Sequence, residues 1–303
     1  MSEANASVAR PNMQGIRDNG RRRPHLNTPT SPRHGASAFF AYLVMAIIFI
    51  IFITPILWLV FAAFDTKATF QTKLPTQWTL ENFSAIMTTD LTFRPLWNSF
   101  VLSLAVTVIV IICSVLAAYP LSRYHSRFNK PFLYSVLFGT CLPISCLMVP
   151  VYALFVSMNL LDSTVGTILF MAASSLPMAV WMTKNFMDSV PIELEEAAWV
   201  DGASLLRSLR LIVVPLMKPG LAVVSIYVFM GAWGNFFVPY MLLLSPSKQP
   251  AAVTIYSFFG LYGTVAYGQL AAFSLIYSIP VIVMYIISNR FLGTYSLAGG
   301  VKG

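Results

Sequence analysis

The chain has 303 residues, of which 57% are hydrophobic and only 10% are charged, and its mean hydropathy is +0.73. Soluble globular domains carry about 25% charged residues, so the composition excludes an ordinary soluble domain and indicates an integral membrane protein. The net charge of +8 follows from an uneven placement of arginine and lysine between the apolar segments, and it gives no indication of nucleic-acid binding.

The first 38 residues are rich in Asn, Pro, Arg and Ser and contain few large apolar side chains. This composition predicts a disordered basic arm, residues 1–38. Arg21-Arg22-Arg23 suggests a twin-arginine export signal as an alternative. However, the apolar run that follows is too long for a signal peptide and lacks a small-residue cleavage site. We therefore expect this run to remain in the membrane as the first helix.

Six uncharged stretches follow, each longer than the roughly 18 residues that suggest a transmembrane helix. Helices satisfy their own backbone hydrogen bonds in lipid, so an all-α membrane domain over residues 39–303 is predicted. Residues 249–268 are also uncharged, but their prolines and glycines favour an external loop, 246–268, that contains an interfacial helix. The six predicted spans are residues 39–64, 95–122, 131–161, 163–183, 219–247 and 269–289.

Arginine and lysine are concentrated in the N-terminal arm, in the loops after the second and fourth spans, and at the C-terminus. The positive-inside rule therefore places both termini in the cytoplasm, including a C-terminal tail, residues 291–303. It also makes the loop 184–218 cytoplasmic.

Several kinds of functional site are not supported by the sequence. The histidines (His25, His34 and His125) are isolated, so no metal site is predicted. The spans carry no ionisable residue near their middle, which disfavours an ion-coupled carrier. There is no phosphate-binding loop, no Ser/His/Asp arrangement and no paired carboxylate on an enclosed surface. A membrane enzyme is therefore disfavoured, and energy for active transport would have to come from a partner.

The cytoplasmic loop 184–218 contains the only dense acidic run of the chain. Pro191 suits the first turn of a helix, and three glutamates then lie near the positive end of its dipole. Gly202 can end this helix, and Ala198 shares a face with it, which allows another protein to approach closely. The following segment, 204–212, has an amphipathic pattern that we expect Pro215 to stop. A solvated helical loop with ordinary dipole compensation remains the simpler alternative. The glutamates are Glu193, Glu195 and Glu196.

The loop resembles the EAA loop of the inner-membrane permease subunits of ABC importers. The match comprises Glu196-Ala197-Ala198, three residues, Gly202, nine residues, and then Ile-x-Val-Pro ending at Pro215, with Val214 where leucine is usual. Further likenesses to carbohydrate permeases occur along the chain from about residue 39. They are Asn98-Ser99, Ala117-Ala118-Tyr119 with Arg123, the turn 160–164, and a terminal 298–303 similar to that of the maltose-type second permease subunit.

The resemblance implies a type I ABC importer transmembrane fold in the bacterial cytoplasmic membrane. It implies three kinds of protein partner: a second homologous permease subunit, two ATPase subunits and an extracytoplasmic sugar-binding protein. ATP and magnesium would be bound by the ATPases, and this chain would carry no catalytic residue and no cofactor. The external loop 246–268 would probe the binding protein. The residues implied to contact the ATPases are Glu196, Ala197, Ala198, Asp201, Gly202 and Pro215 in the loop, and Gly300, Val301, Lys302 and Gly303 in the tail.

Trp233 and Asn235 resemble part of a family pattern in the fifth span, although Gly234 stands where asparagine is usual. They could line a sugar path, because sugars present both hydroxyl groups and apolar faces. A helix–helix hydrogen bond is the alternative for such an asparagine. The sequence leaves open a secondary carrier or channel, and an ABC permease for a solute other than a sugar.

Overall fold

The structure is a computed structural model that describes residues 33–124, 126–259 and 265–299, with side chains described only between 38 and 287. These parts are helical, apart from turns, loops and two isolated β-bridges. Most of the predicted basic arm and the last four residues of the predicted tail lie outside the described residues.

The chain divides into two units, residues 1–51 and 52–303. Within the first unit, the described part is the beginning of helix α1 (Arg33–Ala63). This helix begins before the predicted start of the span at residue 39, and its candidate membrane span is Ala38–Ala63. The most apolar part of this span has no buried residue, as expected for a helix that faces lipid.

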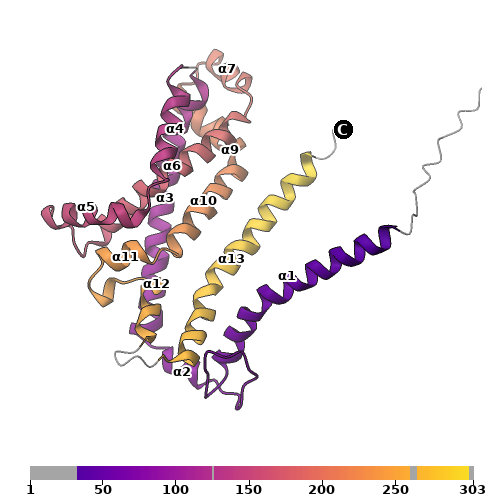
Figure 1. The fold of residues 1–303 in the computed structure, drawn as a ribbon. Helices are drawn as coiled ribbons and strands as arrows, with labels where there is room; N and C mark the ends of the chain where they lie inside the picture. The colour runs from indigo at the N-terminus through magenta and orange to yellow at the C-terminus, as the bar shows by residue number, and fades with distance from the viewer. Residues whose placement is uncertain (1–32, 125, 260–264, 300–303) are drawn as a thin grey trace, which may run out of the picture. The chain divides into compact units, whose positions relative to one another are not determined.

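The core of the second unit is built on the long helix α3 (Arg94–Arg123), against which α6 (Thr164–Asp188) and α10 (Lys218–Trp233) pack (Figure 1). One apolar cluster joins the three helices, with Val106, Ala172 and Val228 among its buried members. Gly220 permits the close approach of α10 to α6, because a Cβ there would lie 2.3 Å from Cγ of Phe186.

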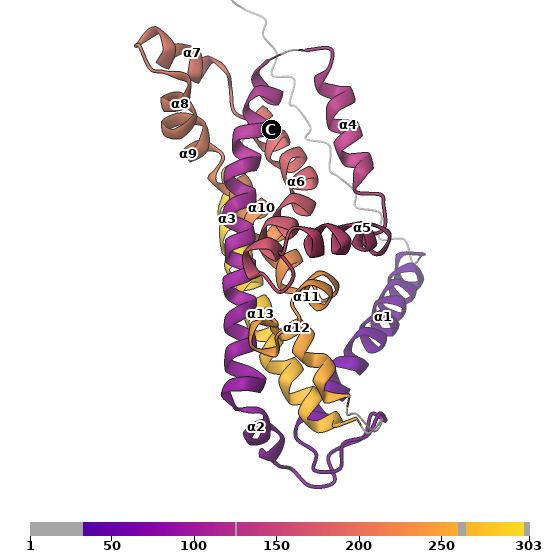
Figure 2. The same ribbon diagram turned by 90° about the vertical axis from the view of Figure 1, so that its left-hand side faces the viewer.

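Two of the predicted spans are not single straight helices. The window 131–161 forms α4 (Asn129–Gly139) and α5 (Ile144–Ser157), which meet at 87° (Figure 2). The window 219–247 breaks after α10, and a short α11 (Phe237–Leu242) follows. Within the described residues, four helices are long and apolar enough to span a membrane, and the number rises to six if each bent pair counts as one span.

Short helices form the predicted external loop and the segment before α3. In the loop, η3 (Pro246–Lys248), α12 (Ala251–Thr254) and η4 (Ile255–Phe258) precede the last helix, α13 (Tyr267–Gly299). Before α3 lie α2 (Glu81–Ile86) and η1 (Thr89–Phe93). Because α13 continues to Gly299, most of the predicted tail 291–303 is helical in backbone.

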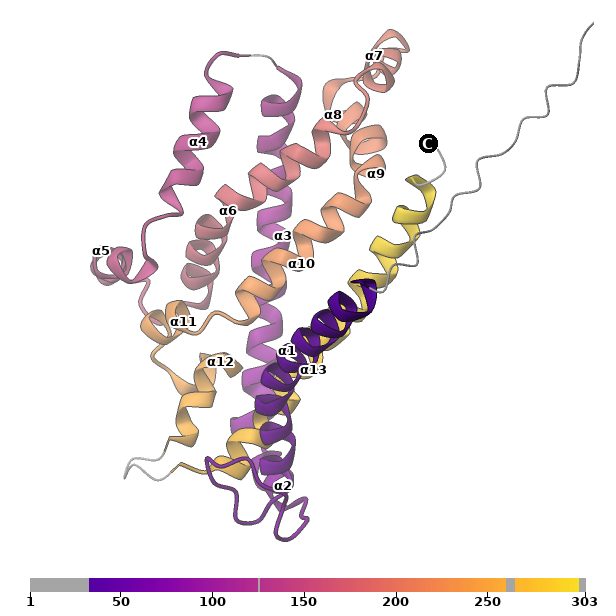
Figure 3. The same ribbon diagram turned by 45° about the vertical axis from the view of Figure 1, so that its right-hand side comes forward.

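The predicted cytoplasmic loop folds as α7 (Glu193–Val200), α8 (Leu205–Ser208), a π-helical turn η2 (Leu209–Val213) and α9 (Val214–Leu216) (Figure 3). Two details differ from the sequence-based expectation. Pro191 precedes α7 instead of lying in its first turn. Pro215 does not stop the segment, because it occupies the first turn of α9, where proline is tolerated. The chain bends by 80° between Leu216 and Lys218.

Candidate functional site

Helix α7 carries Glu196, Ala197 and Ala198, which are among the residues implied to contact the ATPases, and it ends just before the expected glycine. Gly202 adopts a left-handed conformation with φ of 81°, which a residue without a Cβ reaches at little cost. Its N–H donates to the carbonyl of Trp199, and the N–H of Ala203 donates to that of Ala198 at 2.9 Å. These two bonds form a Schellman motif, so the prediction that Gly202 ends the helix is confirmed.

The glutamate beside the predicted motif, Glu195, points into the protein and is 0% exposed. Nε of Arg123 donates to its Oε1 at 2.6 Å, and Oη of Tyr119 donates to its Oε2 at 2.8 Å. A second nitrogen of Arg123, Nη2, donates to the carbonyl of Val190 at 3.1 Å. Both partners lie on the last turns of α3, so that helix holds α7 through a buried ion pair.

The other side of α7 faces outward. Glu196, Ala197 and Val200 share it, because positions three and four apart lie on one helix face, and all three are exposed. Val200 is 89% exposed. Ala198 is half-buried, whereas Asp201, Gly202 and Pro215 are exposed. The exposed surface of α7 thus combines a carboxylate with small apolar groups.

A second polar contact joins the same end of α3 to the end of α6. Oγ of Ser122 donates to Oδ1 of Asp188 at 2.6 Å, and Lys184 forms an ion pair with Oδ2 of the same carboxylate. Asp188 lies five residues before α7 begins. The connection into α7 is therefore fixed to α3 on both sides of Val190.

The opposite end of α3 holds the predicted external loop. Nδ2 of Asn98 donates to the carbonyls of Ser247 and Gln249, at 2.9 and 3.1 Å. Oγ of Ser99 accepts a hydrogen bond from the N–H of Ala251 at 2.8 Å. The Asn98-Ser99 pair noted in the sequence therefore satisfies backbone groups of the loop that have no helical partner.

The same loop is tied to the turn between α5 and α6 by Asp162. Its carboxylate accepts hydrogen bonds from the N–H groups of Leu244 and Ser245 and from Oγ of Ser245, and it pairs with Nζ of Lys248 at 2.8 Å. These donors, first among them the Lys248 ammonium, hold the pKa of Asp162 well below its usual range. The carboxylate stays ionised over the physiological pH range.

The two predicted path residues lie near the break after α10. Trp233 is 3% exposed, and its ring stacks between Phe229 and Tyr277 with centroids 5.9 and 5.5 Å away. Its indole nitrogen has no hydrogen-bond partner within the described part of the chain. Oδ1 of Asn235 accepts from the N–H of Val238 at 3.1 Å and so begins α11. Contact of Trp233 or Asn235 with a solute stays a prediction.

The tail residues Gly300, Val301, Lys302 and Gly303 lie outside the described residues. Among the residues that are described, no group of His, Cys, Asp and Glu could hold a metal ion. The sequence does contain one indication of a binding site for Glu195. Tyr119 and Arg123 lie four residues apart near the end of α3 and therefore share one face of that helix.

The fold and the EAA-like loop together define a multi-pass permease component of the inner membrane. Residues 110–295 match the family described as the binding-protein-dependent transport system inner membrane component. The match covers more than half of the chain, and the chain belongs to this family.

Named relatives align along nearly the whole chain. The sulfoquinovosyl glycerol transport system permease protein SmoH of Agrobacterium fabrum is 31% identical, and the alignment covers 90% of this chain and 98% of the relative. The maltodextrin transport system permease protein MdxG of Bacillus subtilis is 30% identical, with 86% and 95% covered. Each alignment includes the EAA-like loop, because it covers most of both chains.

A solved structure confirms the fold. A chain of a bacterial ABC transporter involved in the import of the acidic polysaccharide alginate matches with a TM-score of 0.75 at 20% identity, and the match covers 86% of this chain and 98% of that chain. The predicted ABC importer transmembrane fold is therefore confirmed. The exact number of spans and the side on which each terminus lies stay predictions.

Proposed function

We propose that the chain is one of two permease subunits of an ATP-driven carbohydrate importer and forms half of its translocation pathway. The observation that carries this proposal is the two-sided construction of α7. Glu195 fixes the helix to α3 through a buried ion pair, while Glu196, Ala197 and Val200 face outward with no other part of the described chain covering them. A partner can therefore push or pull on a helix that transmits the displacement.

The proposed partner on this surface is an ATPase subunit, which binds ATP and magnesium and supplies the energy. Closure of two such ATPases moves α7, and the Glu195–Arg123 pair carries that displacement into α3 and the bundle packed on it. The terminal residues 300–303 are proposed to reach between the ATPases. In this proposal, the ATPase subunits bind and hydrolyse the nucleotide, and this chain does neither.

At the opposite end, the external loop is proposed to contact the binding protein that delivers the solute. The assignment of a carbohydrate rests on the sugar-containing solutes named for the relatives. The indole N–H of Trp233 has no partner among the described residues, and this supports a place for Trp233, with the neighbouring Asn235, beside the sugar path at the break between α10 and α11.

The test is the ATPase activity of the reconstituted complex with its loaded binding protein. An Ala197→Asp substitution adds a charge and volume to the exposed side of α7, and we expect it to abolish the stimulation while the complex stays in the membrane. The paired Glu196→Ala/Ala197→Asp variant is expected to do the same. Glu81→Gln is the matched control, because Glu81 is an exposed glutamate of a short helix near the external end.

Undiminished stimulation in the α7 variants would contradict the proposed coupling role. Solute flux that is insensitive to ATP would instead support a secondary carrier or channel. If coupling is lost as expected but the ligand carried by the binding protein is an amino acid, a peptide or phosphate, the permease role stands and the carbohydrate assignment is wrong.

A further inference from the structure

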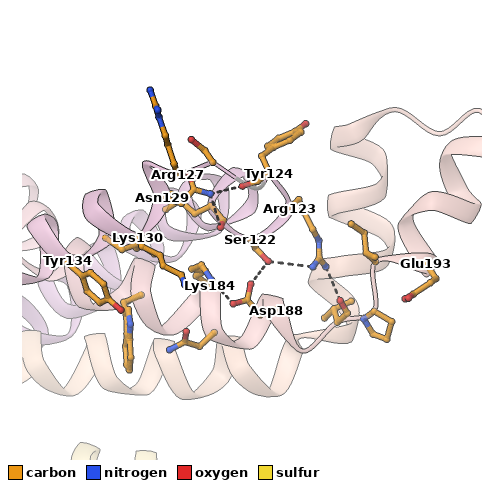
Figure 4. Close-up of a pocket in the computed structure, with 18 residues that line it drawn as sticks. Ser122, Arg123, Tyr124, Arg127, Asn129, Lys130, Tyr134, Lys184, Asp188 and Glu193 are labelled. Atoms are coloured by element: carbon orange, nitrogen blue, oxygen red, sulfur yellow. Dashed lines mark hydrogen bonds and ion pairs between the residues drawn. The ribbon is translucent and has the colours of Figure 1, made fainter.

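A cavity of about 920 Å³ lies beside the predicted cytoplasmic loop 184–218 (Figure 4). It is formed by the connection between α3 and α4, the first turns of α4, the last turns of α6 and the segment that leads into α7. One part of its lining is cationic and another part is apolar and aromatic. The cationic part includes Arg127, Lys130 and Lys184, and the apolar and aromatic part includes Leu133, Tyr134 and Trp181.

The cations of this cavity outnumber the carboxylates available to them. Asp188 already pairs with Lys184 and accepts from Ser122, and Arg123 is engaged by Glu195. Lys130 has no carboxylate partner within 4.0 Å among the residues that the structure describes. In Figure 4 its side chain extends toward Lys184, whereas Glu193 lies at the opposite end of the cavity.

Arg127 adds a further positive charge at the rim. Its guanidinium lies 4.9 Å from the ring centroid of Phe128, and in the close-up it extends away from the cavity floor (Figure 4). Like Lys130, it forms no ion pair within the described ranges. Lys184 keeps its Asp188 partner, so Lys130 and Arg127 are the charges that no carboxylate of the described residues balances. Screening by water is reduced in a partly enclosed space, which strengthens their attraction for an anion. The cavity is therefore suited to an anion.

The aromatic lining indicates where that anion comes from. Tyr134 and Trp181 are both exposed, and such amphipathic rings are enriched where a membrane meets water. The buried Leu133 continues the apolar side of the cavity. The charge asymmetry of the sequence assigns this end of the bundle to the cytoplasmic leaflet, whose anionic headgroups attract clustered Lys and Arg.

We infer that the cavity binds the phosphate group of an anionic phospholipid of the cytoplasmic leaflet. Lys130 and Lys184 contact the phosphate, Arg127 adds charge at the rim, and Tyr134 and Trp181 border the glycerol end of the acyl chains. A soluble phosphate ester has the same anionic chemistry, but it does not need the aromatic side. This site is separate from the exposed surface of α7, and the inference does not depend on which solute is transported.

The experiment uses the full chain in its complex, placed in nanodiscs of phosphatidylglycerol or of phosphatidylcholine. A photoactivatable phosphatidylglycerol probe is crosslinked, and the labelled peptides are mapped by mass spectrometry. We expect labelling of residues 126–134 and 181–188. Lys130→Gln should reduce this labelling about fivefold, and adding Lys184→Gln about fivefold again, as expected for the loss of one interfacial cation each.

Lys130→Gln is a safe first variant, because Lys130 is exposed and forms no ion pair that holds the described fold together. The matched control is Arg210→Gln/Lys218→Gln, which removes two exposed cations from the same predicted membrane side but outside the cavity. The control should leave labelling unchanged.

Three outcomes would overturn the inference. The first is equal labelling of the cavity peptides in Lys130→Gln and the unaltered chain. The second is an equal decrease in the control, which would indicate only general surface charge. The third is protection of these peptides by excess inorganic phosphate, which would assign the cavity to a soluble phosphate. Rescue of labelling by Lys130→Arg supports the lipid site.

Discussion

The two ends of α3 hold two different segments, and they do so with different chemistry. At the predicted external end, Asn98 and Ser99 form neutral hydrogen bonds to the backbone of the external loop. At the predicted cytoplasmic end, Tyr119 and Arg123 bind the buried carboxylate of Glu195. About 32 Å of helix, at 1.5 Å per residue, separates Asn98 from Tyr119.

The two kinds of contact differ in how easily they open. Neutral hydrogen bonds to a loop contribute about 1 kcal/mol each, so they can open and close as the loop moves. A buried ion pair is far more costly to break on one side. The cytoplasmic contact is thus suited to stay closed while it transmits force, and the external contact is suited to reversible movement.

The largest expected effect comes from breaking the cytoplasmic contact. Glu195→Ala leaves the buried Arg123 without a counter-charge, which costs about 3–5 kcal/mol. We expect a lower thermal unfolding temperature of the purified complex and loss of ATPase stimulation. Glu195→Gln should recover part of the stability, because it can still accept from Tyr119. Glu196→Ala is the control for stability. An equal decrease of the unfolding temperature in Glu195→Ala and Glu196→Ala would contradict the importance of the Glu195–Arg123 ion pair.

A smaller effect is expected at the external end. Asn98→Ala removes two hydrogen bonds to loop carbonyls, with an expected cost of about 1–3 kcal/mol for the groups left unpaired. Hydrogen exchange of residues 246–252 should become faster, while basal ATPase activity is retained.

Asn129→Ala is the matched control for that variant. Its Nδ2 also donates to two carbonyls, those of Leu121 and Tyr124, but at the other end of α3. The external loop should exchange at the unaltered rate in this control. Equal acceleration by both variants would show that the loop responds to α3 as a whole and not to Asn98.

Gly202→Ala tests how firmly the end of α7 is fixed. A Cβ at this position meets no atom within 4 Å, so the cost is confined to the left-handed backbone, about 1–2 kcal/mol. We expect a modest decrease of coupling without unfolding. Gly231→Ala is the control, because Gly231 also has open space around it but lies within α10 and has no positive φ. Loss of coupling in Gly231→Ala but not in Gly202→Ala would contradict the expectation.

The smallest effect concerns pH at the external turn. The pKa of Asp162 is lowered in the folded chain, chiefly by Lys248 and Ser245. A lowered pKa contributes stability that is present above the unfolded pKa of about 3.9 and is lost as the pH falls toward the folded value. The stability difference between the unaltered chain and Asp162→Asn should be constant from about pH 8 to 5 and shrink below about pH 4. Thermal unfolding in detergent measures it, and a difference independent of pH down to about pH 3 would contradict the assignment.

Local signals in the sequence predicted part of this arrangement. Gly202 ends α7 as expected, because the backbone conformation there favours glycine whatever surrounds it. The apolar windows identified the helices, but hydropathy does not register direction, so the bend between α4 and α5 was missed. The sequence also does not predict which glutamate of α7 points inward, because Glu195 and Glu196 are chemically identical and only the distant Tyr119 and Arg123 distinguish them.

The placement of the Glu195 contacts has a consequence for biosynthesis. All the partners of Glu195 precede it in the chain, so the ribosome has already produced them when α7 emerges, and N-terminal parts generally fold first. The contacts of Asn98 and Ser99 need residues 247–251, which are made later. Docking of α7 onto α3 can therefore be complete before α10 and α13 enter the membrane.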